Sequence, residues 1–181
     1  MVYFSSKGTG DLNIQAEIGS LLSEIYAITD YHIYRTDTYS TSSSTQSEII
    51  SGYSFPNNGD WEIYADTMVT ANSMRWEIGS TSTYKYGGLG INGAGYVRAF
   101  QGNGSNAELS TSTHGTFTKN SWIPLKIVRD GTDFKYYYNG SLIETLSVSS
   151  WISSVDSFPL FFNRWGSSGT LSVKNLKVKP L

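Results

Sequence analysis

The side chains best suited to chemistry in this sequence are those that could hold a sugar. A first set is consecutive in the chain: Asn163, Arg164 and Trp165. It combines an indole ring that can stack on the apolar face of a sugar with an amide and a guanidinium that can bond hydroxyl groups. A second set alternates along the chain and would share one strand face: Tyr96, Arg98 and Phe100. The sequence therefore predicts two candidate glycan-binding sites. The alternative is that these aromatic side chains cover the core or a seam between subunits.

Paired carboxylates, the usual machinery for cleaving glycosidic bonds, do not occur at a suitable spacing. A retaining glycosidase needs two carboxyl groups about 5–5.5 Å apart. The nearest candidates are Glu62 and Asp66, with Tyr64 between them. In a strand they would lie roughly 13 Å apart, at about 3.3 Å per residue. We therefore predict that the chain has no catalytic residues and is not an enzyme.

Metal and cofactor sites are also not expected. The chain has no cysteine, and its two histidines, His32 and His114, are far apart. The alternative is a calcium site, formed by Asp130 and Asp133 in one turn or by Asn103 and Asn106 in another. The run Gly-Leu-Gly-Ile-Asn-Gly at 88–93 superficially matches a dinucleotide fingerprint, but it neither follows a hydrophobic strand nor opens a helix. We interpret its glycines as turn residues and predict no cofactor.

The elements that must position these side chains are short strands. Apolar residues alternate with polar ones in several segments, and the following are expected to point inward: Trp61, Ile63, Trp76, Ile78, Leu125, Ile127, Leu171 and Val173. Asp130-Gly131 and Asn139-Gly140 indicate two consecutive hairpin turns. A change of phase in the last strand indicates a bulge near Lys174-Asn175. Strands without intervening helices predict an all-β antiparallel sandwich.

The N-terminal third is expected to differ from the rest. One seam of apolar residues has the alternating 4, 3 spacing of a heptad: Ile14, Ile18, Leu21, Ile25 and Ile28. It predicts a short helix that either assembles into a homotrimer or packs on its own domain. Residues 36–47 are rich in Ser and Thr and are expected to form a linker. The predicted division is an anchor or oligomerisation segment at 1–35, the linker at 36–47, and a sandwich at 48–181.

Composition excludes some partners. Charged residues make up 15% of the chain and the formal net charge is -2, so a nucleic-acid partner is not expected. The longest apolar runs are too short for membrane insertion. The start of the chain lacks the pattern of an export signal. We expect a virion or extracellular location, although a cytoplasmic protein would fit this composition equally well.

Two segments resemble a known family. Residues 121–143 and the closing Gly-Thr-Leu-Ser-Val-Lys-Asn-Leu-Lys-Val resemble the concanavalin A-like lectin/glucanase superfamily, and together the resemblance spans most of 48–181. It implies a jelly-roll sandwich. A short helix ahead of such a head resembles phage tail-fibre, receptor-binding or capsid-decoration proteins. That resemblance implies a non-enzymatic virion structural or receptor-binding protein that binds host-surface glycans and partners itself or other virion proteins. The alternatives are a free-standing microbial carbohydrate-binding module or lectin and, third, a glycan hydrolase or lyase.

Overall fold

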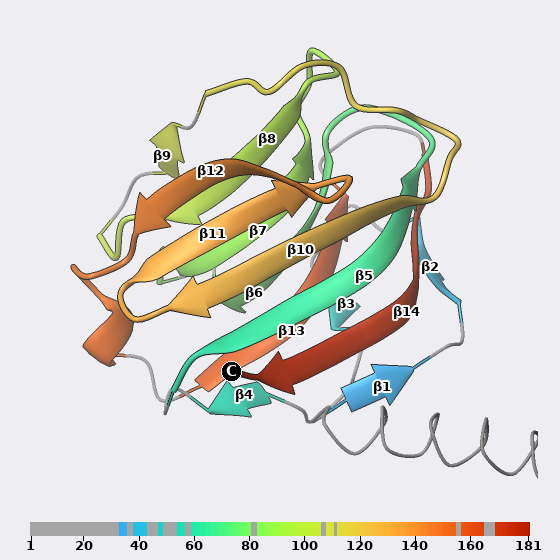
Figure 1. Ribbon diagram of the computed structural model, residues 1–181. Helices are drawn as coiled ribbons and strands as arrows, with labels where there is room; N and C mark the ends of the chain where they lie inside the picture. Colours follow the sequence, from blue (N-terminus) through green and yellow to red (C-terminus); the bar gives the residue numbers. More distant parts are fainter. Residues whose placement is uncertain are drawn as a thin grey trace, which may run out of the picture.

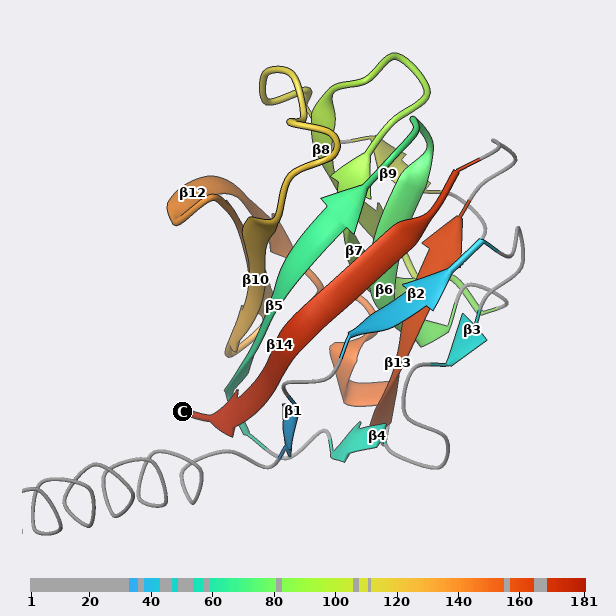
Figure 2. The ribbon, with the colours of Figure 1, turned by 90° about the vertical axis from the view of Figure 1, so that its right-hand side faces the viewer.

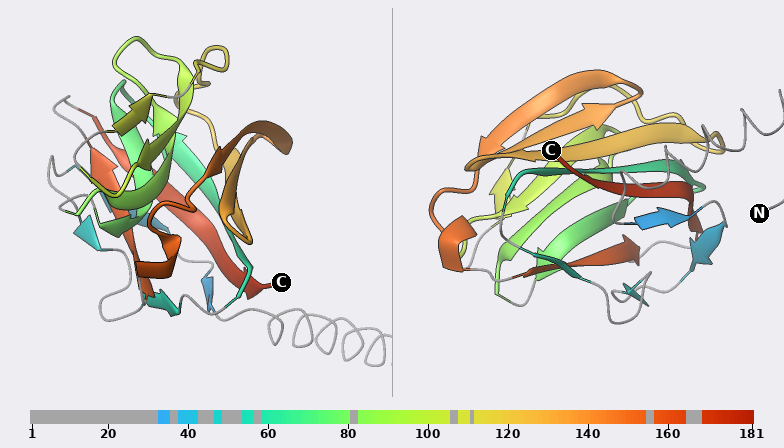
Figure 3. Two further views of the ribbon diagram at one scale, coloured as in Figure 1. Left: turned by 90° about the vertical axis from the view of Figure 1, so that its left-hand side faces the viewer. Right: turned by 60° about the horizontal axis from the view of Figure 1, so that its bottom comes forward.

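Two antiparallel sheets packed face to face make up the part of the chain that the computed structural model describes (Figure 1). The described residues are 33–35, 38–42, 47–48, 54–56, 59–80, 83–105, 108–110, 112–154, 157–164 and 169–181. The predicted N-terminal helix and its apolar seam, Ile14 to Ile28, lie outside them. Figure 3 shows the two layers one above the other. The predicted all-β antiparallel sandwich is confirmed.

The first sheet, called sheet A, contains both ends of the described chain. Its strand order is β1-β14-β5-β10-β11-β12, and β2 also pairs with β14. The strands are β1 (Ile33–Arg35), β2 (Tyr39–Thr41), β5 (Trp61–Val69), β10 (Ile123–Asp130), β11 (Asp133–Tyr138), β12 (Ser141–Ser147) and β14 (Leu171–Pro180). Figure 2 shows β14 lying between β5 and the short β2. The last strand is thus an interior strand of its sheet.

The second sheet, sheet B, has the order β3-β13-β6-β7-β8-β9, and β4 also pairs with β13. Its strands are β3 (Ser47–Glu48), β4 (Ser54–Pro56), β6 (Met74–Ser80), β7 (Lys85–Ile91), β8 (Val97–Gly102), β9 (Glu108–Ser110) and β13 (Ser157–Arg164). A 3-10 turn, η1 (Ile152–Ser154), comes between β12 and β13 in the chain. Because the chain moves between the sheets, residues far apart in sequence become neighbours on one face.

The core lies between the sheets and consists of the residues that the alternation predicts. Strand β5 alternates strictly between buried and half-buried positions. All eight residues expected to point inward are buried in one hydrophobic cluster, from Trp61 at 4% exposure to Trp76 at 0%. Each large apolar side chain buried in this way contributes roughly 1.5–3 kcal/mol. The core therefore stabilises the sandwich without disulfides.

The turns and the bulge are also confirmed. Asn139 and Gly140 have φ values of 48° and 81°, and Gly131 has 59°, as tight hairpins with right-handed strand twist require. In β14 the pairing with β5 shifts between Lys174 and Lys177, and Asn175 has a φ of 52°. This extra residue restores the phase of the strand. As a result Leu171, Val173, Leu176 and Val178 are all buried.

Two segments differ from the sequence-based expectations. The glycines of 87–90 are not turn residues, because β7 runs straight through them. A strand uses glycine where a neighbouring side chain or backbone needs the space of a Cβ atom. Tyr39–Thr41, inside the predicted linker, pairs with β14, as does Ile33–Arg35 of the predicted anchor. Tyr and Thr are good strand formers, and β14 offers them a free edge. The division into segments otherwise stays a prediction.

Candidate functional site

The outer face of sheet B, the face turned away from the core, gathers the polar side chains of interest. Its register forms one row across four strands, with Asn163 opposite Arg75, Arg75 opposite Gly90, and Gly90 opposite Arg98. In the next row Glu77 is opposite Gly88, and Gly88 is opposite Phe100. Directly paired residues lie on the same face of an antiparallel sheet. The strand order therefore collects arginines, a carboxylate and an aromatic ring in one place.

Arg75 is the centre of this cluster. Its Nε lies 2.5 Å from Oε1 of Glu77, and the side chains are only 5% and 0% exposed. Its guanidinium carbon lies 4.4 Å from the ring centroid of Phe100 and 5.6 Å from that of Tyr86. Arg98 approaches the same Phe100 ring at 5.7 Å. An ion pair taken out of water is stable only with such close partners. The cluster thus holds Arg75 and Glu77 in fixed positions.

The glycines of β7 make room for this arrangement. A Cβ atom on Gly88 would lie 3.0 Å from Cγ of Glu77, and one on Gly90 would lie 2.7 Å from Cβ of Arg75. Any larger residue would therefore force β6 and β7 apart or displace the ion pair. Gly90 lies between Arg75 and Arg98 in the row, and the side chain of Arg75 uses the space that a Cβ atom at Gly90 would fill.

A hollow of about 290 Å³ opens at this end of the face, with Ser73, Arg75, Ile91, Asn92, Gly93, Arg98 and Phe100 lining it. Its rim is a pair of turns fixed by side-chain hydrogen bonds. Oδ1 of Asn92 accepts the backbone N–H groups of Ala94 and Tyr96, both at 3.0 Å. Asn72 donates to the carbonyl of Gly93 at 3.0 Å. These bonds hold the turns at the rim in a defined conformation.

The second predicted site set lies at this face, and of the first set only Asn163 shares its register. Arg98 and Phe100 line the hollow, and Tyr96, two residues earlier, is 43% exposed. Asn163 shares the row of Arg75, whereas Arg164 pairs with Met74, a core residue. The register therefore places Asn163 and Arg164 on opposite faces, while Trp165 lies outside the described residues.

The sequence did not indicate that Arg75 and Glu77 belong to a candidate site. They alternate with the core residues Trp76 and Ile78, and such positions normally face solvent. The nearest signal in the sequence was the glycine-rich strand that follows them.

The carboxylates considered for catalysis lie on the other sheet and have structural partners. Oδ1 of Asp66 accepts the hydroxyl of Tyr64 at 2.6 Å, and its Oδ2 accepts Nδ2 of Asn175 at 2.6 Å. Burial and then the bond to Asp66 raise the pKa of Tyr64 to about 12. Glu62 lies 3.6 Å from Nζ of Lys126. These contacts fix the outer surface of β5 and leave no acid–base pair there.

Within the described ranges, the structure contains neither a metal-binding cluster nor a membrane-spanning helix. No group of three or more His, Cys, Asp or Glu side chains within them could hold a metal ion. None of the helical structure in those ranges is long and apolar enough to cross a membrane.

Comparison with known proteins gives a fold but no close relative. The sequence matches no protein-family model, and no curated protein matches it. Among solved structures, the carbohydrate-binding module CBM66 from Bacillus subtilis is similar, with a TM-score of 0.53, 16% identity, and coverage of 80% of this chain and 96% of the module. A putative glycosyl hydrolase from Parabacteroides distasonis has a TM-score of 0.56, 13% identity, and coverage of 82% and 90%. The family 7 alginate lyase A1-II′ has a TM-score of 0.53, 10% identity, and coverage of 83% and 84%.

These similarities define the class of fold: a concanavalin A-like jelly-roll sandwich, as the resemblance in the sequence implied. They correct the prediction that the chain is not an enzyme. Alginate lyases and a putative glycosyl hydrolase share the fold with a carbohydrate-binding module, so the fold is capable of catalysis. The missing pair of carboxylates argued only against one mechanism of glycan cleavage. The phage-like part of the resemblance has no counterpart among these structures.

Proposed function

We propose that the outer face of sheet B binds an acidic polysaccharide, one whose sugars carry carboxylate groups. The observation that carries this proposal is the row Arg75–Gly90–Arg98 beside Phe100. Arginine presents a planar fork of donors that matches a carboxylate, and the ring of Phe100 packs against the guanidinium groups of both arginines. Because a guanidinium donates charge-assisted hydrogen bonds to a carboxylate, a sugar that carries a carboxylate suits the row better than a neutral sugar.

The similar structures support a glycan as the ligand class. One is described as a carbohydrate-binding module and another as an alginate lyase. Because the sequence identity of these structures to this chain is low, they support the proposal through the fold alone. The preference for an acidic sugar is inferred from the arginines.

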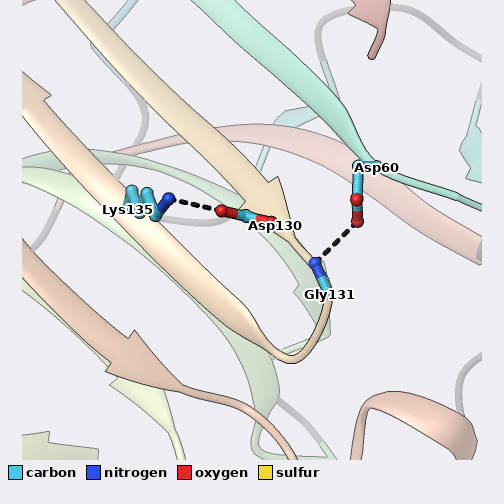
Figure 4. Close-up of polar contacts among 4 residues, drawn as sticks. All are labelled: Asp60, Asp130, Gly131 and Lys135. Carbon is cyan, nitrogen blue, oxygen red and sulfur yellow. Dashed lines mark hydrogen bonds and ion pairs between the residues drawn. The ribbon is translucent and has the colours of Figure 1, made fainter.

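Binding of polygalacturonate and alginate fragments, measured by calorimetry against a neutral glucan, tests the proposal. Arg98→Ala is expected to weaken acidic-fragment binding roughly tenfold to a hundredfold, from about 1.5–3 kcal/mol for a hydrogen bond to a charged group. Lys135→Ala is the matched control, because it removes a cation from the other sheet, where Lys135 pairs with Asp130 beside a hairpin turn (Figure 4). Equal affinity of the Arg98 and Lys135 variants contradicts the proposal.

A second candidate function is cleavage of the same polysaccharide by β-elimination. It is favoured by the exposed side chain of Tyr96, which comes just before β8 and close in sequence to Arg98. Neutralising a uronate carboxylate makes the neighbouring C–H proton easier to remove, and a phenol can act in proton transfer. A hydroxide ion from solvent takes that proton, the electron pair of the C–H bond forms the C=C bond, the glycosidic C–O bond breaks, and the departing oxygen takes up the proton of the Tyr96 hydroxyl. The unsaturated product absorbs in the ultraviolet. Turnover that Tyr96→Phe abolishes, with binding retained, supports cleavage, whereas no absorbing product from any acidic polysaccharide leaves binding alone.

A separate proposal, based on the sequence, concerns where the protein is found and how it assembles. Attachment to a virion or another particle, and trimerisation through the Ile14–Ile28 seam, are tested by the mass of the full chain in solution. Deleting residues 1–32 leaves β1, which pairs with β14, in place. A trimer that becomes a folded monomer on this deletion supports the seam, and a full-length monomer at high concentration contradicts it.

A further inference from the structure

Two polar side chains at the rim of the sheet B hollow, Ser73 and Asn92, have no role in the arginine row. Both line the hollow together with Arg75 and Arg98. Ser73 is the last residue before β6, and Asn92 directly follows β7. The two turns are joined by a backbone hydrogen bond, in which the N–H of Ser73 donates to the carbonyl of Asn92 at 3.2 Å. The rim therefore carries these two residues next to each other.

The backbone of Ser73 has an unusual conformation for serine. Its φ is +60°, in the left-handed region that residues other than glycine and asparagine seldom adopt. Among the described residues, three of the other four non-glycine positions with positive φ are asparagines. Glycine would fit this turn without strain, so the turn itself does not require a serine. Strained positions of this kind cluster at binding sites, and here the strained residue adds a hydroxyl group to the hollow.

The hydroxyl of Ser73 has no hydrogen-bond partner in the part of the chain that the structure describes. Its position is marked by Gly93, because a Cβ atom on Gly93 would lie 3.5 Å from Oγ of Ser73. Gly93 is exposed and lines the same hollow. Since glycine leaves the space beside Oγ open, a ligand can approach the hydroxyl from that side. A serine hydroxyl can both donate and accept a hydrogen bond.

The side-chain amide of Asn92 is oriented by its own turn. Its Oδ1 accepts the backbone N–H groups of Ala94 and Tyr96, both at 3.0 Å. These two bonds settle which end of the amide is oxygen and leave Nδ2 on the other side of the amide. Across the described ranges, Nδ2 of Asn92 has no hydrogen-bond partner. It therefore presents two N–H donors in a fixed direction at the edge of the hollow.

An amide donor beside a serine hydroxyl matches a sugar hydroxyl, which accepts one hydrogen bond and donates another. The hollow, at about 290 Å³, is at the small end of ligand pockets, which span roughly 300–1,000 Å³. It therefore has room for a short segment of a sugar chain. Because Arg75 and Arg98 line the same hollow, one sugar can place its carboxylate at the arginines and a hydroxyl at the rim.

We propose that Ser73 and Asn92 determine specificity by binding a free hydroxyl group of the acidic sugar, so that the site takes polysaccharides without O-acetyl groups. The proposal rests on the acidic-polysaccharide binding proposed above. Nδ2 of Asn92 donates to the oxygen of the sugar hydroxyl, and that hydroxyl donates to Oγ of Ser73. An O-acetyl group removes the proton that Ser73 accepts and adds bulk against turns that hydrogen bonds already hold. The arginines then select the charge of the sugar, and the rim selects its substitution.

The test compares ligands of equal charge: polygalacturonate and alginate fragments, each with its O-acetylated counterpart, measured by calorimetry on the full chain. Wild type should bind the unmodified fragments roughly tenfold more tightly. Ser73→Gly should weaken that binding roughly threefold to tenfold and leave the acetylated fragments nearly unaffected, so that the preference disappears. Its melting temperature should stay the same or rise, because glycine adopts a φ of +60° without strain. Asn120→Gly is the matched control, since it makes the same backbone change at +58° away from the hollow and should bind as wild type.

The side-chain amide of Asn92 provides a second measurement. In ¹⁵N-labelled protein, its NH₂ signals should shift with an unmodified fragment and stay in place with the acetylated one, whereas those of Asn120 should stay in place with both. Arg98→Ala should weaken both kinds of fragment by the same factor, because their charge is the same.

The outcomes separate this proposal from the one on which it rests. If wild type binds no acidic fragment, the proposed function fails and this proposal is overturned with it. If wild type binds acetylated and unmodified fragments equally, or Ser73→Gly keeps the preference, only the role of the rim is overturned. A loss of affinity in Ser73→Gly that comes with a lower melting temperature also overturns it, because Ser73 would then act through the fold.

Discussion

Replacing Glu77 with glutamine is the most informative single change, because it tests whether the buried ion pair organises the sheet B site. Glutamine keeps the shape of the side chain but removes its charge. Arg75 is then left 5% exposed with its cation no longer paired by a carboxylate at 2.5 Å. Removing one partner of a buried pair typically costs about 3–5 kcal/mol. For a chain of this size each kcal/mol lowers the melting temperature by roughly 2–4 °C, so a fall of about 6–20 °C is expected.

Calorimetric melting and urea unfolding measure this effect. The companion variant, Arg75→Met with Glu77→Leu, removes both charges and should recover most of the stability, because an apolar pair of similar size can replace a buried ion pair. The same double variant should bind acidic fragments more weakly than the wild type, because it lacks Arg75. A loss below about 1 kcal/mol in Glu77→Gln would refute the reasoning, because it would mean that water or other groups already compensate Arg75.

Three further changes test other parts of the structure. Gly131→Ala should cost roughly 1 kcal/mol in urea unfolding, because φ is +59° and an added Cβ meets nothing within 4 Å, so only backbone strain contributes. A loss near zero would contradict that turn geometry. Tyr136→Phe should lower the free energy of unfolding by about 1–2 kcal/mol, because it removes the hydroxyl that donates to buried Gln101 at 3.2 Å. An unchanged free energy of unfolding would show that this hydrogen bond does not contribute to stability. Asp66→Asn should lower the pKa of Tyr64 from about 12 toward 10, though not fully, because burial is the larger cause. Tyr64 is neutral in the folded chain until about pH 12 but ionises from pH 10 when unfolded, so its contribution to stability is lost between those values. Ultraviolet titration of phenolate absorbance in both proteins should show the shift, and identical curves would exclude it.

Sequence reasoning predicted the parts of the fold that depend on local pattern. The alternation around Trp76, the turns at Gly131 and Gly140, and the bulge at Asn175 each follow from a few neighbouring residues. The glycines of β7 were assigned to turns because their reason for being there is not local. Gly90 is needed where Arg75 of the neighbouring strand occupies the space.

The same dependence on local sequence pattern explains which residues of the site could be predicted. Arg98 and Phe100 were found because they alternate along one strand. Asn163 was assigned to a rival site because no sequence pattern shows that β13, β6, β7 and β8 are neighbours in that order. Arg75 was not considered, because alternation alone makes its position look solvent-exposed. Its burial depends on Tyr86 and Phe100, which come from two other strands.

The interior position of β14 has a consequence for how the chain is made. Strand β5 is synthesised well before one of its two partners, β14, with Ile63 paired to Val178. Contacts between such distant segments are slow to form, because a long loop must close first. On the ribosome, β5 must wait with one edge unpaired until β14 has emerged from the exit tunnel. A nascent chain of this protein is therefore expected to depend on chaperones, and premature termination before residue 171 should give an aggregating product rather than a smaller folded one.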